Sequence, residues 1–151
     1  MAHLLLIDAL NLIRRLYAVQ ERPYLPVTDE VAEGTKTQII RNTENMLRQA
    51  LARLQQELAP SHAVLVFDGR NSLWRKTLYA EYKANRSETP EDLIPQFPMI
   101  RDATRAFSLP LIEEEDVEAD DMIASYAKAA SAARALRNCS SGVARLLPRP
   151  I

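Results

Sequence analysis

Two short apolar runs, each closed by an aspartate, restrict the folds open to this chain more than any other feature. Residues 4–8 read LLLID and residues 64–68 read VLVFD. Runs of this length that are apolar at every position are typical of strands buried on both faces of a parallel sheet. Because parallel strands end at one edge of their sheet, we expect Asp8 and Asp68 at the same edge.

Helical periodicity separates the apolar runs. Apolar side chains recur at every third or fourth position in several stretches, and a third short apolar run, residues 109–112, lies between two of them. The helical stretches are residues 9–19, 39–58, 93–107 and 118–130. Residues 21–37 contain two prolines and a glycine and predict a loop. This alternation favours an α/β fold with a central, mainly parallel sheet flanked by helices.

The size and composition indicate one ordinary globular domain. The chain has 151 residues, of which 47% are hydrophobic and 26% are charged. No apolar run approaches the roughly 18 residues needed to span a bilayer, so we expect no membrane segment. Cys139 is the single cysteine. It excludes an internal disulfide and fits a reducing, cytoplasmic location.

The charges are strongly segregated although the net charge is only −1. Residues 70–86 contain five bases and one acid, whereas residues 113–121 contain seven acids and no base. A local positive field collects phosphates, and a local negative field collects cations. The basic segment also contains Trp74, Tyr79 and Tyr82. A polar, aromatic connection of this length is typical of a functional segment.

The acids at the predicted strand ends and helix start are the ligands that a divalent metal prefers. These candidates are Asp8, Asp68, Glu118, Asp120 and Asp121. Hard carboxylate oxygens suit Mg²⁺ or Mn²⁺. Two such ions about 3.5–4 Å apart supply a nucleophile and charge neutralisation in phosphodiester cleavage. For each acid taken alone, capping a helix or complementing its dipole is the competing interpretation.

Several motifs resemble the 5′-nuclease family. Residues 74–86 read WRKTLYAEYKANR and are followed by EADD at residues 118–121. Residues 5–15, LLIDALNLIRR, resemble the stand-alone bacterial flap endonucleases, and residues 73–107 equally resemble the N-terminal domain of bacterial DNA polymerase I. The match covers about residues 3–130. It implies a PIN-like fold that acts on DNA with 5′ ends or flaps, in DNA replication and repair.

The resemblance also implies roles for individual residues. The five acids match the first metal cluster of the family, whose complete site holds two ions, Mg²⁺ or Mn²⁺. Lys83 and Arg86 match a basic element of the helical arch over the active site. There Lys83 would contact the scissile phosphate and Arg86 would stabilise the phosphate backbone. Arg75 and Lys76 would add backbone contacts. Tyr82 would stack on an unpaired base, with packing inside the arch as the alternative.

The chain departs from the family pattern near its end. Residues 131–151 contain no acid, although a second Asp-x-Asp element should follow there, and the Gly-rich helix-hairpin-helix is missing. We therefore expect residues 1–132 to be the N-terminal part of the domain. Residues 133–151 are expected to be an atypical, poorly ordered tail left by truncation or a change of reading frame. Metal binding should then be weakened, and cleavage slow or absent.

Three functions fit these residues. The first is a metal-dependent 5′–3′ exonuclease and flap endonuclease, in which water attacks the DNA phosphodiester and leaves a 5′-phosphate. The second is a DNA-binding module without turnover. The third is a PIN-type ribonuclease, which would not need the long segment over residues 69–90. The residues leave open whether end trimming or flap cutting dominates, whether a polymerase domain belongs to the full gene, and what the oligomeric state is.

Overall fold

Two compact units make up the chain. One contains Met1–Leu10, Pro60–Glu88 and Leu109–Ile151, and the other contains Asn11–Ala59 and Thr89–Ser108. The computed structural model describes residues 3–24, 32–69, 74–82, 84, 93–94, 97–132, 137–140 and 143–147. All acids named as metal ligands fall in the first unit.

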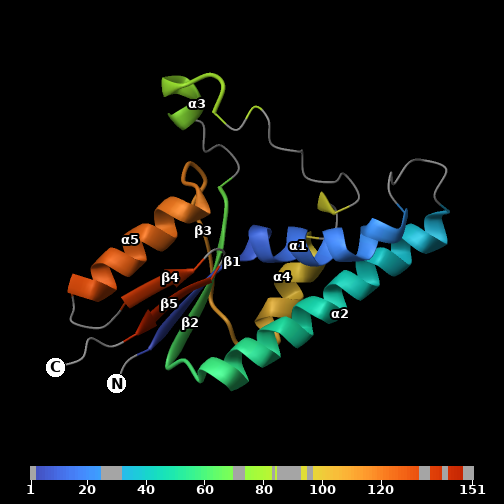
Figure 1. The fold of residues 1–151 in the computed structure, drawn as a ribbon, viewed down its shortest axis with the longest axis horizontal. Coiled ribbons are helices and arrows are strands. Elements are labelled where there is room, and N and C mark those ends of the chain that lie inside the picture. The colour runs from blue at the N-terminus through green and yellow to red at the C-terminus, as the bar shows by residue number, and fades with distance from the viewer. Residues whose placement is uncertain are drawn as a thin grey trace. The chain divides into compact units, whose positions relative to one another are not determined.

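The first unit is built on a five-stranded sheet with the order β3-β2-β1-β5-β4 (Figure 1). Its strands are β1 (Leu4–Asp8), β2 (His62–Phe67), β3 (Leu111–Glu113), β4 (Arg137–Ser140) and β5 (Val143–Leu147). β1 and β2 are parallel, as are β2 and β3. β5 is antiparallel to β1, and β4 is antiparallel to β5. The predicted α/β fold with a parallel sheet is confirmed.

The two apolar runs form the centre of this sheet, as their composition predicts. Leu5, Leu6 and Ile7 of β1 are buried at consecutive positions, as are the last three residues of β2. The helix α5 (Ala119–Ala132) packs on them: Ile123 lies against Leu6, and Met122 lies against Val66. Burial at consecutive positions explains why neither strand alternates polar and apolar residues.

The strands β4 and β5 lie where the sequence pattern predicts none. β5 pairs with β1 through the register Leu5↔Arg145 and Ile7↔Val143. An antiparallel pair forms through backbone N–H and C=O groups, so it does not require a regular pattern of side chains. The expected division of the chain at residue 132 coincides with the end of α5 at Ala132 and stays a prediction.

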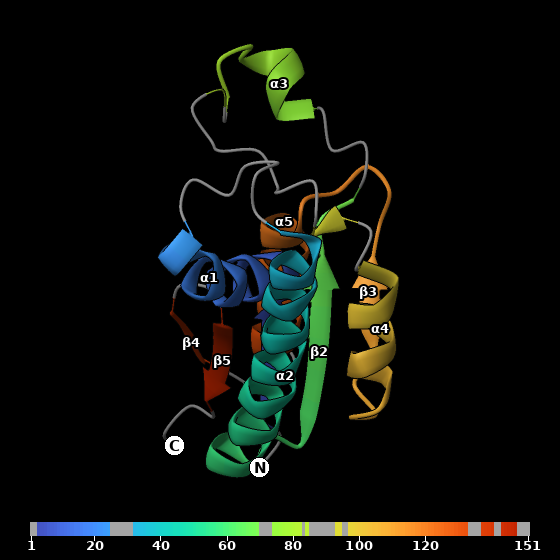
Figure 2. The same ribbon diagram turned by 90° about the vertical axis from the view of Figure 1, so that its right-hand side faces the viewer.

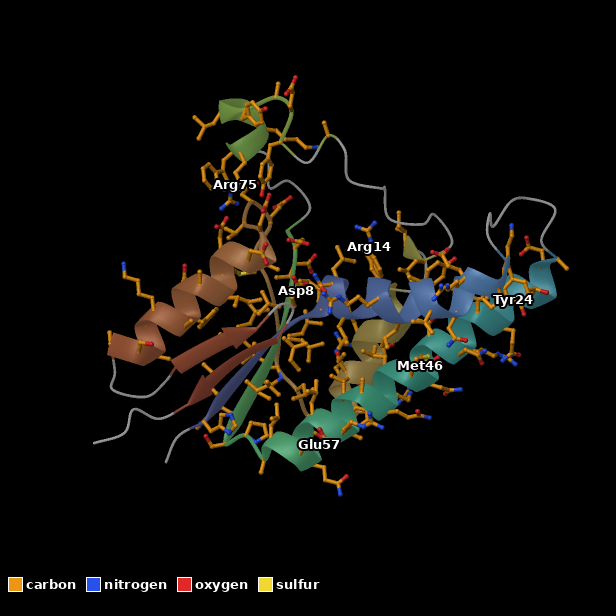
Figure 3. The ribbon with its side chains drawn as sticks, in the orientation of Figure 1. Asp8, Arg14, Tyr24, Met46, Glu57 and Arg75 are labelled. Carbon is orange, nitrogen blue, oxygen red and sulfur yellow. The ribbon has the colours of Figure 1, made fainter. Side chains whose placement is uncertain are left out.

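The second unit contains the helices α2 (Glu33–Leu58) and α4 (Phe97–Arg105) and a short 3-10 turn over Arg22–Tyr24. It also contains the helix α1 (Ala9–Glu21) except for its first two residues, which belong to the first unit. Gln20 of α1 accepts a hydrogen bond from Asn42 at 3.1 Å and donates one to Met46 of α2 at 2.8 Å (Met46 is labelled in Figure 3). On α2, Ile39, Leu47 and Leu51 are buried. Their spacing matches the periodicity seen in the sequence.

The helix α2 begins earlier than its apolar pattern suggests. The amides of Thr35 and Lys36 both donate to the carbonyl of Ala32, at 2.8 and 3.1 Å, so the first turn forms from polar residues. The helix ends where Ala59 adopts a left-handed conformation (φ 39°, ψ 53°) before Pro60. Over the residues that the structure describes, no helix, α2 included, combines the length and apolarity needed to cross a bilayer.

Candidate metal and nucleic-acid site

Two aspartates lie where neighbouring parallel strands end. Asp8 is the last residue of β1 and is paired in register with Val66 of β2, two positions before Asp68. Both side chains are half-buried. The C-terminal end of β2 also points toward α3 (Trp74–Leu78) in both views of the ribbon (Figures 1 and 2). Ligands of open α/β sheets bind at this edge.

A hydrogen bond joins the end of β2 to the start of α5. The Oδ1 atom of Asp68 accepts a hydrogen bond from the backbone N–H of Ala119 at 2.8 Å. The first N–H groups of a helix have no partner inside the helix and carry its positive partial charge, so a carboxylate is favoured there. This contact joins Asp68 to Ala119, the residue between the acids Glu118 and Asp120 in the sequence.

The backbone of Gly69 packs closely at the same place, where the end of β2 meets the start of α5. Its N–H donates to the carbonyl of Val117 at 2.9 Å. A Cβ atom at this position would lie 1.9 Å from the carbonyl oxygen of Glu114 and 2.5 Å from that of Glu115. Only glycine lets the chain pass so close to the acidic loop. Our sequence reasoning missed this residue, and its position directly after the strand-ending Asp68 was the available signal.

The guanidinium of Arg75 in α3 binds two of the candidate metal ligands. Its Nη1 atom lies 3.1 Å from Oε2 of Glu118 and 2.6 Å from Oδ2 of Asp121. Its Nη2 atom donates to the other oxygen of Asp121, so that Arg75 and Asp121 form a bidentate ion pair. Only 5% of the Glu118 side chain is exposed, against 31% for Asp121 and 25% for Arg75. Figure 3 shows Arg75 pointing from α3 toward the start of α5.

Two aromatic residues complete this group. The Cζ atom of Arg75 lies 4.2 Å from the centroid of the Trp74 ring and 5.7 Å from that of Tyr82. The hydroxyl of Tyr82 donates to Oε2 of Glu118 at 3.2 Å. The hydrogen bond to Asp121 raises the pKa of Arg75 above its ordinary value, so this guanidinium is charged at every physiological pH. We call these five residues the Arg75 cluster.

The other predicted site residues are distributed as follows. Lys76 is exposed on α3, and Asp120 is exposed in the first turn of α5. Lys83 and Arg86 lie outside the described residues. The DNA-binding and catalytic roles of the basic residues therefore stay predictions. The pairing of Arg75 with acids was not foreseen, although the basic segment and the acidic segment were both evident in the sequence.

The chemistry of the acids fits a hard divalent cation, but their present arrangement is not a finished metal site. Among the described residues, no three Asp, Glu, His or Cys side chains are gathered closely enough to hold a metal ion. All the candidate donors are carboxylate oxygens, the type that Mg²⁺ and Mn²⁺ bind. Two of these carboxylates, on Glu118 and Asp121, already converge on a cation, the guanidinium of Arg75.

Comparison with known proteins gives consistent results. A family model described as the 5′-3′ exonuclease, N-terminal resolvase-like domain matches residues 3–141. The flap endonuclease Xni of Colwellia psychrerythraea is 41% identical over 130 residues, which are 83% of this chain and 45% of that protein. The DNA polymerase I of Rhizobium leguminosarum is 42% identical over 133 residues, 86% of this chain and 13% of that protein. The chain spans less than half the length of these curated relatives.

The fold is also similar to that of a solved structure, the T5 D15 protein co-crystallised with metal ions. The TM-score is 0.53 at 22% sequence identity, covering 86% of this chain and 44% of that one. At this identity the likeness concerns the fold alone. The family match extends over most of the residues that form the sheet, α5 and the Arg75 cluster. The chain therefore belongs to the 5′-3′ exonuclease family, of which it carries the N-terminal resolvase-like domain.

Proposed function

We propose that this chain is the metal-holding, N-terminal portion of a nuclease that hydrolyses DNA phosphodiester bonds at 5′ ends or flaps. Membership of the family supports this function. The observation that carries it is the hydrogen bond from the Ala119 amide to Asp68. It links the acid-bearing edge of the sheet to the acidic start of α5 and so supports the proposal that carboxylates from distant parts of the sequence serve one site.

The acids would hold Mg²⁺ or Mn²⁺. Asp8 and Asp68 contribute from the strand ends, and Glu118, Asp120 and Asp121 contribute from the start of α5. A divalent ion bound there would activate water for attack on phosphorus and neutralise charge on the phosphate. These carboxylates would orient such an ion, because strand ends and a helix start fix their backbone positions.

The basic segment would bind the substrate. Lys83 would contact the scissile phosphate, and Arg86 would stabilise the neighbouring backbone. Lys76, exposed on α3, would add a phosphate contact whose strength falls with salt concentration. The exposed Trp74 and Tyr79 give this segment aromatic surface on which unpaired bases can stack.

A cleavage assay tests the proposal. A 5′-labelled flap DNA is incubated with the full chain, with Mg²⁺ or with a chelator, and the products are separated by size. We expect Mg²⁺-dependent product, and a rate reduced by about 100-fold or more in Asp68→Asn and Asp120→Asn, as for loss of a charge-stabilising group at a reacting phosphate. Asp102→Asn is the matched control, because Asp102 is an exposed aspartate of the second unit.

The same assay separates the alternatives. Flap DNA that is bound but not cut with Mg²⁺ would support a binding module without turnover. Faster cleavage of a single-stranded RNA of the same sequence would support a ribonuclease. Product that forms equally with a chelator would contradict any metal-dependent function.

A further inference from the structure

In the Arg75 cluster, a charged guanidinium contacts carboxylate oxygens that a metal ion would also bind. Arg75 contacts both oxygens of Asp121 and one oxygen of Glu118. These two acids are candidate metal ligands, and Glu118 is nearly buried. A divalent cation bound to the same carboxylates would repel the guanidinium at close range and compete for the same lone pairs.

One oxygen atom links this competition to the rest of the cluster. Oε2 of Glu118 is 3.1 Å from Nη1 of Arg75 and accepts a hydrogen bond from the Tyr82 hydroxyl at 3.2 Å. A metal ion that takes Oε2 therefore weakens two contacts at once. These contacts, with the pair to Asp121, attach α3 and the turn at Tyr82 to the start of α5.

We propose that Arg75 is an internal counter-ion that neutralises Glu118 and Asp121 until a divalent cation displaces it, and that its displacement releases α3 from α5. This inference rests on the proposed metal site and adds a switch to it. Arg75 and Tyr82 are held against the acids until the metal binds, and the guanidinium of Arg75 then becomes available to phosphate.

The chain contains a built-in reporter for this exchange. Trp74 is its single tryptophan, and the Arg75 guanidinium lies 4.2 Å from the centroid of its ring. A cation over the ring face stabilises the indole electrostatically and perturbs its emission. Release of Arg75 on metal binding should therefore change the fluorescence of the whole protein.

The test combines two measurements on the full chain at constant ionic strength, because salt screens exposed charges. Isothermal calorimetry gives the dissociation constant for Mg²⁺, and Trp74 emission is recorded over the same titration. The variants are Arg75→Gln, which removes the guanidinium, and Arg75→Lys, which keeps the charge but loses the two-pronged contact. Lys128→Gln is the matched control, because it removes one positive charge from the same unit at an exposed position of α5. Circular dichroism confirms that each variant is folded.

We expect Arg75→Gln to bind Mg²⁺ about three- to tenfold more tightly, because the competing positive charge is lost. Arg75→Lys should fall between this variant and the unchanged chain, and Lys128→Gln should bind like the unchanged chain. Trp74 emission should respond to Mg²⁺ in the unchanged chain and not in Arg75→Gln.

Two results would overturn the switch while leaving the metal site intact: binding no tighter in Arg75→Gln than in Lys128→Gln, or Mg²⁺ binding without any change of Trp74 emission. If calorimetry shows no Mg²⁺ binding to the unchanged chain or to Arg75→Gln, both the switch and the proposed metal site are wrong.

Discussion

A methyl group at Gly69 would lie 1.9 Å from the carbonyl oxygen of Glu114. Atoms cannot approach so closely, so the backbone would have to shift. Gly69→Ala should therefore lower the free energy of unfolding by about 1–3 kcal/mol, the usual range for forcing extra atoms into a packed site. Urea denaturation measures this change. Gly34→Ala is the control, because nothing lies within 4 Å of a Cβ at Gly34. There alanine should be neutral or stabilising by up to about 1 kcal/mol. Equal urea midpoints for the two variants would contradict the packing at Gly69.

Glu21 predicts a pH dependence of stability. Burial raises the pKa of this carboxyl above its ordinary value of 4.5, and the nearby positive charge of Arg14 only partly opposes the shift. The folded state therefore holds the proton more tightly than the unfolded state. Between pH 4.5 and the raised pKa, this group makes stability fall as the pH rises. Its position as the last residue of α1 adds to the cost, because a helix C-terminus disfavours negative charge.

Glu21→Gln should consequently be more stable than the unchanged chain at pH 7, with the gain vanishing as the pH falls below 4.5, where the carboxyl is protonated in both states. Urea midpoints at several pH values measure this. Glu57→Gln, at an exposed glutamate of α2, should show no such gain. A stabilisation by Glu21→Gln that persists unchanged at low pH would show that charge is not its cause.

Among the elements, the helix α5 is capped at its N-terminus in part by Asp68, the residue that follows β2. Its carboxylate accepts a hydrogen bond from the Ala119 amide. Asp68→Ala should lower the free energy of unfolding by about 0.5–2 kcal/mol, as for loss of a helix cap. Asp68→Asn keeps an accepting oxygen and should lose less. Both should lose Mg²⁺ affinity, because both remove the charged ligand. Thermal and urea unfolding, paired with calorimetry, separate these roles. Full stability of Asp68→Ala would mean that the contact does not support α5.

The elements were predictable to the extent that apolar residues define them. β1 and β2 carry continuous apolar runs, and α5 carries one apolar face, so all three were found with nearly correct bounds. The first turn of α2 and the short helix α3 consist of polar residues, and nothing in their periodicity marks them. β5 is stabilised by pairing with β1, a contact that local sequence does not encode.

At the scale of the whole molecule, the parallel sheet allows acids far apart in the sequence to serve one place. Asp8 and Asp68 could be assigned to the same edge because parallel strands end together. The Arg75–Asp121 pair joins positions 46 residues apart, and no pattern in the chain specifies which base meets which acid. The sequence alone therefore placed Asp8 and Asp68 at one edge of the sheet, whereas the Arg75 cluster required the fold.

The proposed function requires acids at the ends of β1 and β2 and at the start of α5 to hold a common divalent ion. Crystals of the chain grown with Mn²⁺ and measured at the manganese absorption edge test this directly. We expect an anomalous peak within about 2.0–2.6 Å of carboxylate oxygens from a strand end, Asp8 or Asp68, and from the start of α5, with Arg75 displaced from Glu118. Manganese bound to acids of only one of these elements, or at neither, would contradict it.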